Sequence, residues 1–343
     1  MVVYLNPNLN QIVRRGVFDL GANFTKFVLA DVNISKIRID ELHYYAKTVV
    51  HYNENLAQPE KQELSYLTSK RYIDSINHYK SDAEINFNDR RNIEFYGILR
   101  YPLSKTANTR AFLDHIYGQT GVKIRTINEH QEGVIAYDSI ITTVGERARN
   151  AILWDINNNN MQLISRKDGD VLVIDSSIAY ESFYNLVKKE IKNTKNIYPL
   201  TKAEINQALE LALDSIKLNP HSENKIKEHL KKGYKIIGRG FVHNYIVQHY
   251  VNLNEMRKRL NFINYVDISH YNVDQLKEAI NLLANKNLQD VIPIMYDKEK
   301  YKYAERELTS LILTYAIMHK LGIKLVHTVN AKNIFGILLN RYD

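Results

Sequence analysis

The stretch from Gly16 to Val32 constrains the fold more than any other part of the chain. β-favouring residues flank the sequence Asp19-Leu-Gly-Ala-Asn23 on both sides. Because glycine lets the backbone turn sharply, the pattern predicts two strands joined by a tight hairpin. The N–H groups of such a turn can point at a phosphate, and an aspartate at its mouth can hold a hydrated Mg²⁺. We therefore predict a phosphate-binding loop, with an ordinary β-turn as the alternative.

A second aspartate follows a predicted strand in the same way. Ala151 to Trp154 is predicted as a strand that leads Asp155 into a turn, and Met161 to Ser165 is predicted as the strand that leaves it. After Ser182 the chain is predicted to be mainly helical. A length of 343 residues is about twice that of a usual domain. The repeat predicts two lobes, residues 1–145 and 146–343, the second with a helical extension.

Composition limits the kinds of site that the protein can contain and indicates where it is located. The chain has no cysteine, which excludes disulfides, thiolate metal sites and cysteine nucleophiles. No apolar run approaches the roughly 20 residues of a membrane helix, and Arg14 and Arg15 follow the apolar N-terminal residues in a layout unlike a secretory signal. We therefore expect a soluble, cytoplasmic protein. The net charge of +8 favours an anionic partner, although basic runs such as 225–235 are also typical of solvated helix faces.

Glu132 is the candidate catalytic residue. It lies in Asn128-Glu-His-Gln-Glu-Gly133, at the start of a predicted helix. A carboxylate near a phosphate can orient and deprotonate water for in-line attack on phosphorus. The alternative is that Glu129 and Glu132 only favour the helix N-terminus electrostatically. Further along the chain, Gly238-Arg-Gly240 can bring backbone and the Arg239 charge to a phosphate, or can be an ordinary turn.

Taken together, these segments resemble the exopolyphosphatase and guanosine pentaphosphate phosphohydrolase (Ppx/GppA) family of the actin-like ATPase superfamily. The resemblance covers nearly the whole chain. Residues 16–26 resemble the first phosphate loop, 127–133 the segment with the catalytic glutamate, and 152–156 the lead-in to the second phosphate loop. Further matches are residues 103–113, the following Gly121, and residues 237–240 and 329–338.

The resemblance implies a two-lobed actin-like (ribonuclease H-like) α/β fold, with mixed sheets flanked by helices and a helix-rich C-terminal half. It implies removal of the terminal phosphate from polyphosphate or from a guanosine pentaphosphate-type nucleotide. Glu132 would activate water, and Asp19 and Asp155 would hold Mg²⁺. The implied phosphate-binding residues are Gly21, Asn23, Lys26, Lys105, Asn158 and Arg239.

The second loop departs from the family pattern, which reads Asp-Ile-Gly-Gly-Gly-Ser-Thr-Glu. Here the three glycines are Asn157, Asn158 and Asn159, and the acidic residue is Gln162. Asparagine tolerates positive φ, but its side chain can block the close approach of a phosphate. The family's arginine before Ala-x-Asn falls at Ser104, with Lys105 adjacent and Arg100 close by. These departures predict weaker binding of Mg²⁺ and phosphate and slower hydrolysis.

Two other functions stay open at this point. The main alternative is a catalytically impaired protein that binds a phosphorylated ligand or a protein partner. Residues 21–26 also resemble the ATP loop of sugar kinases, although the stretch around Glu132 matches the phosphatase branch better. No nucleic-acid-binding motif is recognisable, so we do not expect nucleic acid as the partner. The sequence is also compatible with a homodimer.

Overall fold

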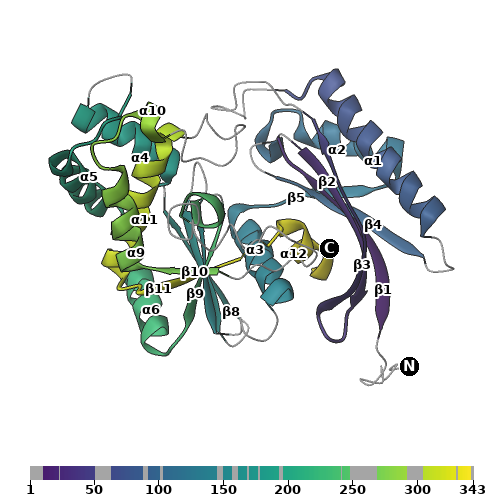
Figure 1. The fold of residues 1–343 in the computed structure, drawn as a ribbon. Helices are drawn as coiled ribbons and strands as arrows, with labels where there is room; N and C mark the ends of the chain where they lie inside the picture. Colours follow the sequence, from purple (N-terminus) through teal and green to yellow (C-terminus); the bar gives the residue numbers. More distant parts are fainter. Residues whose placement is uncertain are drawn as a thin grey trace. The chain divides into compact units, whose positions relative to one another are not determined.

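The chain divides into two compact units. Unit 1 comprises Met1–Thr142 and Lys332–Asp343, and unit 2 comprises Thr143–Ala331. Figure 1 shows the computed structural model. It describes residues 11–22, 24–50, 63–87, 92–100, 103–144, 150–156, 161–167, 170–176, 178–192, 196–240, 242–247, 269–291, 304–329 and 331–340.

Unit 1 is built on a five-stranded mixed sheet with the order β3-β2-β1-β4-β5. The hairpin predicted from residues 16–32 is the antiparallel pair β1–β2, in which Asp19 lies opposite Lys26. β3 continues the antiparallel part, whereas β4 is parallel to β1 and β5 is parallel to β4. The strands are β1 (Ile12–Leu20), β2 (Phe24–Asn33), β3 (Arg38–Val49), β4 (Ile93–Leu99) and β5 (Lys123–Thr126).

Helices cover both faces of this sheet. Successive strand residues point to opposite faces, so Phe18 joins the core beneath α1 and α2, while Val17 joins the core beneath α3 and α12. Asp19 has the same parity as Val17 and therefore lies on the α3 and α12 face. The helices are α1 (Tyr66–Asn86), α2 (Thr109–Thr120), α3 (Glu129–Val144) and α12 (Asn333–Leu339), and a short 3₁₀ turn, η2 (Leu103–Lys105), precedes α2.

The last helix of the chain, α12, belongs to unit 1, whereas the sequence prediction placed all of residues 146–343 in the C-terminal lobe. Ile334 and Ile337 of α12 complete the apolar core with Ile135 of α3. Gly336 permits the close approach, because a Cβ atom there would lie 2.0 Å from the Ile135 carbonyl oxygen. Local periodicity predicts such a helix but does not specify which sheet the helix covers.

Unit 2 is built on a six-stranded mixed sheet with the order β10-β11-β9-β6-β7-β8. The second predicted hairpin is the antiparallel pair β6–β7. β9 is parallel to both β6 and β11. The strands are β6 (Ala151–Ile156), β7 (Met161–Lys167), β8 (Asp170–Ser176), β9 (Lys235–Arg239), β10 (Ser269–Asn272) and β11 (Leu325–Thr328).

Helix α11 is the centre of the helical layer of unit 2. It is buried on nearly all sides, and its serine and threonine hydroxyls donate to backbone carbonyls about one turn earlier, as where Thr314 donates to the Ser310 carbonyl oxygen at 2.7 Å. The helical elements are α4 (Tyr180–Val187), α5 (Lys202–Ser215), α6 (Pro220–Lys231), α9 (Val273–Leu283), α10 (Leu288–Val291) and α11 (Glu307–Leu321), with π-type turns η4 (Lys188–Lys192) and η5 (Val242–Val247). Among the described residues, no helix combines the length and the apolar character needed to span a bilayer. The predicted α/β fold of mixed sheets flanked by helices is confirmed.

Candidate functional site

Asp19 is held by an arginine from the neighbouring parallel strand. Arg100 follows β4 directly, and its backbone N–H donates to the Leu20 carbonyl oxygen at 3.0 Å. Its side chain donates from Nε to Asp19 Oδ1 at 2.7 Å and from Nη2 to Asp19 Oδ2 at 2.9 Å. Two parallel bonds of this kind fix both the position and the plane of a carboxylate. Asp19 is 1% exposed, so its carboxylate is buried beside the first hairpin and held there by Arg100.

The same arginine also binds the candidate catalytic residue. Arg100 donates from Nη1 to Glu132 Oε1 at 3.0 Å. Glu132 lies in the first turn of α3, which Asn128 and Gln131 cap reciprocally through bonds of 2.8 and 3.0 Å. The Glu132 side chain is 29% exposed, compared with 1% for Asp19. Glu132 is therefore held in place by Arg100 while remaining accessible to water.

Charge balance keeps Asp19 and Arg100 ionised. Burial by itself would raise the pKa of Asp19, but the positive charges of Arg100 and Lys26 and their hydrogen bonds outweigh burial and lower that pKa. Burial likewise opposes the charge on Arg100, yet the carboxylates of Asp19 and Glu132 raise the pKa of its guanidinium. At neutral pH these groups form a buried network of paired charges.

Three lysines gather on the same face of the sheet. Lys26 lies opposite Asp19 on one side and opposite Lys47 of β3 on the other, and its Nζ is 3.3 Å from Asp19 Oδ2. Lys332, just before α12, places its Nζ 3.5 Å from the centre of the Tyr45 ring. Partial burial and then the charges of Lys26 and Lys47 lower the pKa of Lys332. Such repulsion between cations is relieved when an anion binds between them.

We call this group the first-hairpin cluster; it consists of Asp19, Lys26, Lys47, Arg100, Glu132 and Lys332. The sequence prediction named Asp19, Lys26 and Glu132; in the structure Arg100 joins Asp19 to Glu132, and Lys26 contacts Asp19. It did not name Lys47, Arg100 or Lys332 as site residues. Lys47 could have been found from the strand register, because it lies opposite Lys26. Lys332 carries no local signal, since only the packing of α12 brings it there.

The other residues predicted in the first lobe have different surroundings. The N–H of Gly21 donates to the Phe24 carbonyl oxygen at 3.0 Å and so closes the hairpin instead of pointing away from it. Lys105 ends η2 and is exposed. Within the described residues it makes no ion pair with Asp19 or Glu132. Asn23, and Asn158 of the second lobe, lie outside the described residues. The phosphate contacts predicted for these four residues stay predictions.

Unit 2 repeats the pairing of an aspartate with an arginine. Asp155 of β6 lies opposite Arg239 of the parallel strand β9, and Arg239 Nη1 is 3.3 Å from Asp155 Oδ2. Arg239 Nε also donates to the Ala331 carbonyl oxygen at 3.1 Å. Gly240 follows with φ of +100°, where a Cβ atom would lie 2.6 Å from the Ile156 carbonyl oxygen. In both units, an arginine at the end of the parallel neighbour therefore neutralises the hairpin aspartate.

Gln162 lies opposite Asp155 on β7 and is also buried. Its amide donates from Nε2 to Asp175 Oδ1 of β8 at 2.7 Å. A carboxylate at position 162, as in the Ppx/GppA pattern, would face Asp175 and repel it. The glutamine therefore fits this side-chain network better than the acidic residue that the pattern contains.

Comparison with solved structures bears on the fold. A protein from Aquifex aeolicus, described as a PPX-GPPA enzyme, superposes with a TM-score of 0.71 over 96% of this chain and 100% of its own length, at 13% identity. The chain has the Ppx/GppA fold. An exopolyphosphatase from Cytophaga hutchinsonii gives a TM-score of 0.60 over 95% of this chain and 96% of its own, at 11% identity. No protein-family model and no curated protein sequence matches the chain.

The predicted resemblance to Ppx/GppA proteins is thus confirmed for the fold, while the Mg²⁺ that it implies does not fit the residues present. Mg²⁺ needs open carboxylate oxygens in near-octahedral geometry. Both Asp19 oxygens already accept N–H groups of Arg100, and Arg239 Nη1 lies 3.3 Å from one Asp155 oxygen, Oδ2. A guanidinium supplies the positive charge at each aspartate. We therefore assign no step of the chemistry to Mg²⁺ at these two residues.

One other group of side chains in the described part of the chain has metal-ligand spacing. It consists of Asp31, Glu41 and His43. Arg14 donates to both oxygens of Asp31 at 2.7 and 3.0 Å, and His43 Nε2 lies 3.1 Å from Asp31 Oδ2. Asp31 is therefore a structural anchor between two basic side chains, and this group carries no metal prediction.

Proposed function

We propose that the chain removes the terminal phosphate from polyphosphate or from a guanosine pentaphosphate-type nucleotide, at a reduced rate and with Glu132 as the general base. The observation that carries the proposal is the Arg100 guanidinium, which binds Asp19 and Glu132 at once. It holds an accessible carboxylate beside a cluster of lysines. The Ppx/GppA fold, shared with an exopolyphosphatase, supports the same reaction class.

The reaction needs three contributions from the chain. Lys26, Lys47 and Lys332 bind the terminal phosphate and offset its negative charge. Glu132 accepts a proton from a water molecule as that water attacks the terminal phosphorus in line with the bridging oxygen. The bridging P–O bond then breaks, the shortened chain leaves as an oxyanion, and inorganic phosphate is released.

Charge stabilisation falls to protein side chains in this scheme. Preorganised cations are effective because they need no reorganisation at the moment of reaction. Arg100 contributes indirectly as a positioning residue, since its pairing with Asp19 fixes the guanidinium that orients Glu132. Lysines are mobile compared with a bound metal ion, and this difference supports slow turnover.

Phosphate release from tripolyphosphate and polyphosphate tests the proposal. Replacement of Glu132 by glutamine preserves size and removes the base, so we expect turnover to fall by about 10²–10⁴-fold. The matched control is Glu278→Gln on the exposed surface of α9, which should behave like the wild type. Each assay is run with Mg²⁺ and with a chelator, and we expect activity to persist in the chelator. Equal release by wild type and Glu132→Gln would sink the proposed mechanism.

A second candidate function is binding without turnover. It is favoured by Gln162, whose engagement with Asp175 leaves no carboxylate at that position. Calorimetry with tripolyphosphate and with guanosine nucleotides, run beside the release assay, separates the two functions. Binding of a ligand that is returned intact would support a sensor rather than a hydrolase.

A further inference from the structure

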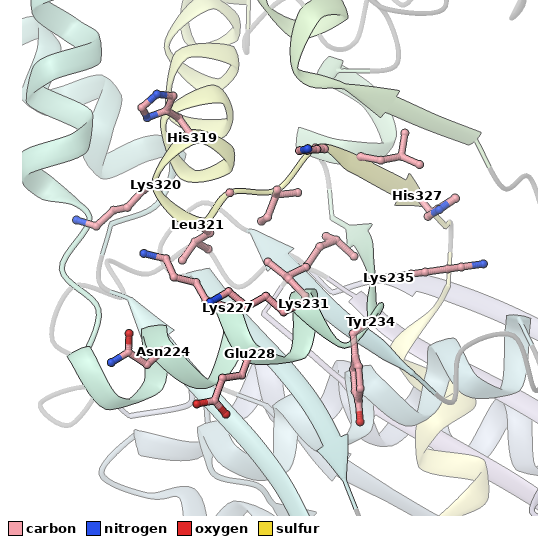
Figure 2. Close-up of a pocket in the computed structure, with 16 residues that line it drawn as sticks. Asn224, Lys227, Glu228, Lys231, Tyr234, Lys235, His319, Lys320, Leu321 and His327 are labelled. Atoms are coloured by element: carbon pink, nitrogen blue, oxygen red, sulfur yellow. The ribbon is translucent and has the colours of Figure 1, made fainter.

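Unit 2 contains a basic pocket that the proposed reaction does not use (Figure 2). It has a volume of about 940 Å³ and lies between α6, the start of β9, the end of α11 and the segment that leads into β11. The charged lysine and glutamate residues of its lining are Lys227, Lys231, Lys235, Lys320, Lys324 and Glu228. Five lysines and one glutamate line the pocket, so its lining carries a net positive charge.

Some of these lysines have structural roles. Lys227 pairs with Glu223 one helical turn away at 2.6 Å. Lys320 donates to the carbonyl oxygens of Leu213 and Ile216 at 3.2 and 2.6 Å and so caps the end of α5. Lys231 lies in the last turn of α6, where a cation favours the helix dipole.

Lys235 and Lys324 have no structural role of this kind. Lys235 begins β9, Lys324 precedes β11, and both are exposed. Within the described part of the chain, neither of them, nor Lys231, has a carboxylate partner at ion-pair distance. Burial and then the charge of Lys235 lower the pKa of the neighbouring His327. Lys231, Lys235 and Lys324 thus line the pocket without a carboxylate partner in the described part of the chain, an arrangement that favours an anionic ligand.

The positions of the cations indicate an elongated ligand. Figure 2 shows Lys227 and Lys320 toward one end of the pocket and Lys235 with His327 toward the other. The pocket volume is at the upper end of the range for ligand sites. A single phosphate ion would fill only a small part of it and contact the lysines at one end. The cations are therefore spaced to follow a chain of charges.

The residues that line the pocket also indicate which kind of anionic polymer it binds. The lining offers lysine ammonium groups, which act as point charges, and it includes no arginine for bidentate recognition. The ring of Tyr234 stacks on His229, with ring centres 4.5 Å apart and planes 15° apart. Single-stranded nucleic acids are usually bound by aromatic rings on which bases stack, and this lining has little to offer them. A phosphate chain without bases fits better.

We propose that the basic pocket binds an extended inorganic phosphate chain at a position separate from the first-hairpin cluster. The identity of the chain rests on the proposed function, whereas the anionic character of the ligand rests on the pocket alone. Lys235 begins the strand that Arg239 ends, which places the pocket about 13 Å along β9 from the Asp155–Arg239 pair. The pocket retains long chains, and a short substrate gains nothing from it.

The experiment compares two triple variants of equal charge. The pocket variant carries Lys231→Glu, Lys235→Glu and Lys324→Glu. The control variant carries Lys202→Glu, Lys217→Glu and Lys277→Glu, which are exposed positions of unit 2 outside the pocket. Binding of long-chain polyphosphate is measured by fluorescence anisotropy at low and at moderate salt. Thermal unfolding checks that both variants are folded.

We expect the pocket variant to bind long chains about tenfold more weakly, or worse, with a shallower salt dependence, because three partly screened charge contacts are lost. The control variant should stay within about twofold of the wild type. Equal loss in both variants would overturn the proposal, as would a wild type that binds no polyphosphate at low salt. Tighter binding of an oligothymidylate of matched charge would assign the pocket to nucleic acid instead.

Turnover separates this proposal from the proposed function. The proposal gives the pocket a role for long chains only, so hydrolysis of tripolyphosphate should be equal in the wild type and in both triple variants. If no protein hydrolyses tripolyphosphate, the proposed function fails while the binding result still decides the pocket. If tripolyphosphate is hydrolysed and the pocket variant binds long chains like the wild type, the pocket proposal fails alone.

Discussion

Arg100 donates two hydrogen bonds to the carboxylate of Asp19, at 2.7 and 2.9 Å, from the end of the strand parallel to the one that carries Asp19. A third N–H of the same guanidinium reaches Glu132. Arg239 and Asp155 repeat the first of these relationships in unit 2. Paired arginines thus provide positive charge at both hairpins.

Removal of Arg100 should destabilise unit 1. Arg100→Ala leaves the buried Asp19 carboxylate with Lys26 as its remaining basic partner, and the loss of one partner of a buried pair costs about 3 kcal/mol. Urea denaturation measures the change. The control is Arg110→Ala on the exposed face of α2, which we expect to cost under about 0.5 kcal/mol. A double-mutant cycle with Asp19→Ala should show coupling, and additive effects would contradict the pairing.

Stability should fall in acid because of Asp19. Its folded-state pKa is lowered, so the folded state binds the proton less readily than the unfolded state does. The resulting stabilisation is fully present above the unfolded pKa of about 3.9 and is lost as pH falls through the lower folded pKa. Urea midpoints measured between about pH 2 and pH 7 should therefore decline less steeply in Asp19→Asn than in the wild type. Parallel curves for the two proteins would be the contrary outcome.

Lys47 and Lys332 should contribute to phosphate affinity. Because each offers one partly solvated charge, we expect Lys47→Ala and Lys332→Ala to weaken tripolyphosphate binding by about three- to tenfold. Calorimetry with Glu132→Gln as the background measures binding without turnover. Lys36→Ala, in the exposed turn between β2 and β3, is the matched control. An equal loss in the control would show that net charge alone matters.

Gly240 should tolerate substitution less well than Gly322. Both have positive φ, +100° and +72°, but a Cβ atom at Gly240 would lie 2.6 Å from the Ile156 carbonyl oxygen, whereas none would meet another atom within 4 Å at Gly322. Gly322→Ala should cost about 1 kcal/mol from backbone strain. Gly240→Ala should cost about 2–4 kcal/mol, because the clash adds to the strain. Thermal unfolding compares the two, and equal costs would contradict the close approach.

Much of the fold could be predicted because its signals are local. The hairpins at residues 16–32 and 151–165 follow from strand patterns around a turn, and α2 ends at Gly121, a residue type that often ends helices. In the structure, Gly121 has φ of +67°, the left-handed backbone conformation that is common for a glycine at the end of a helix. Signals of this kind depend on neighbours in the sequence, so they need no knowledge of tertiary structure.

The site was predicted only in part because its geometry is not local. Asp19 and Glu132 could be named from motifs, but the residue that joins them, Arg100, is set by the parallel pairing of β1 and β4. Arg100 directly follows β4, and the ends of parallel strands meet at one edge of a sheet. Lys332 was beyond prediction, because nothing nearby indicates that α12 packs against unit 1.

Because α12 belongs to unit 1 but follows unit 2 in the sequence, unit 1 is completed last during protein synthesis. The ribosome makes the strands of unit 1 first and α12 only after every residue of unit 2. Until then, Val17 and Val28 of the sheet and Ile135 of α3 lack the α12 side chains that complete their core in the folded protein. We therefore expect nascent unit 1 to expose apolar surface until α12 is made, a state in which aggregation competes with folding.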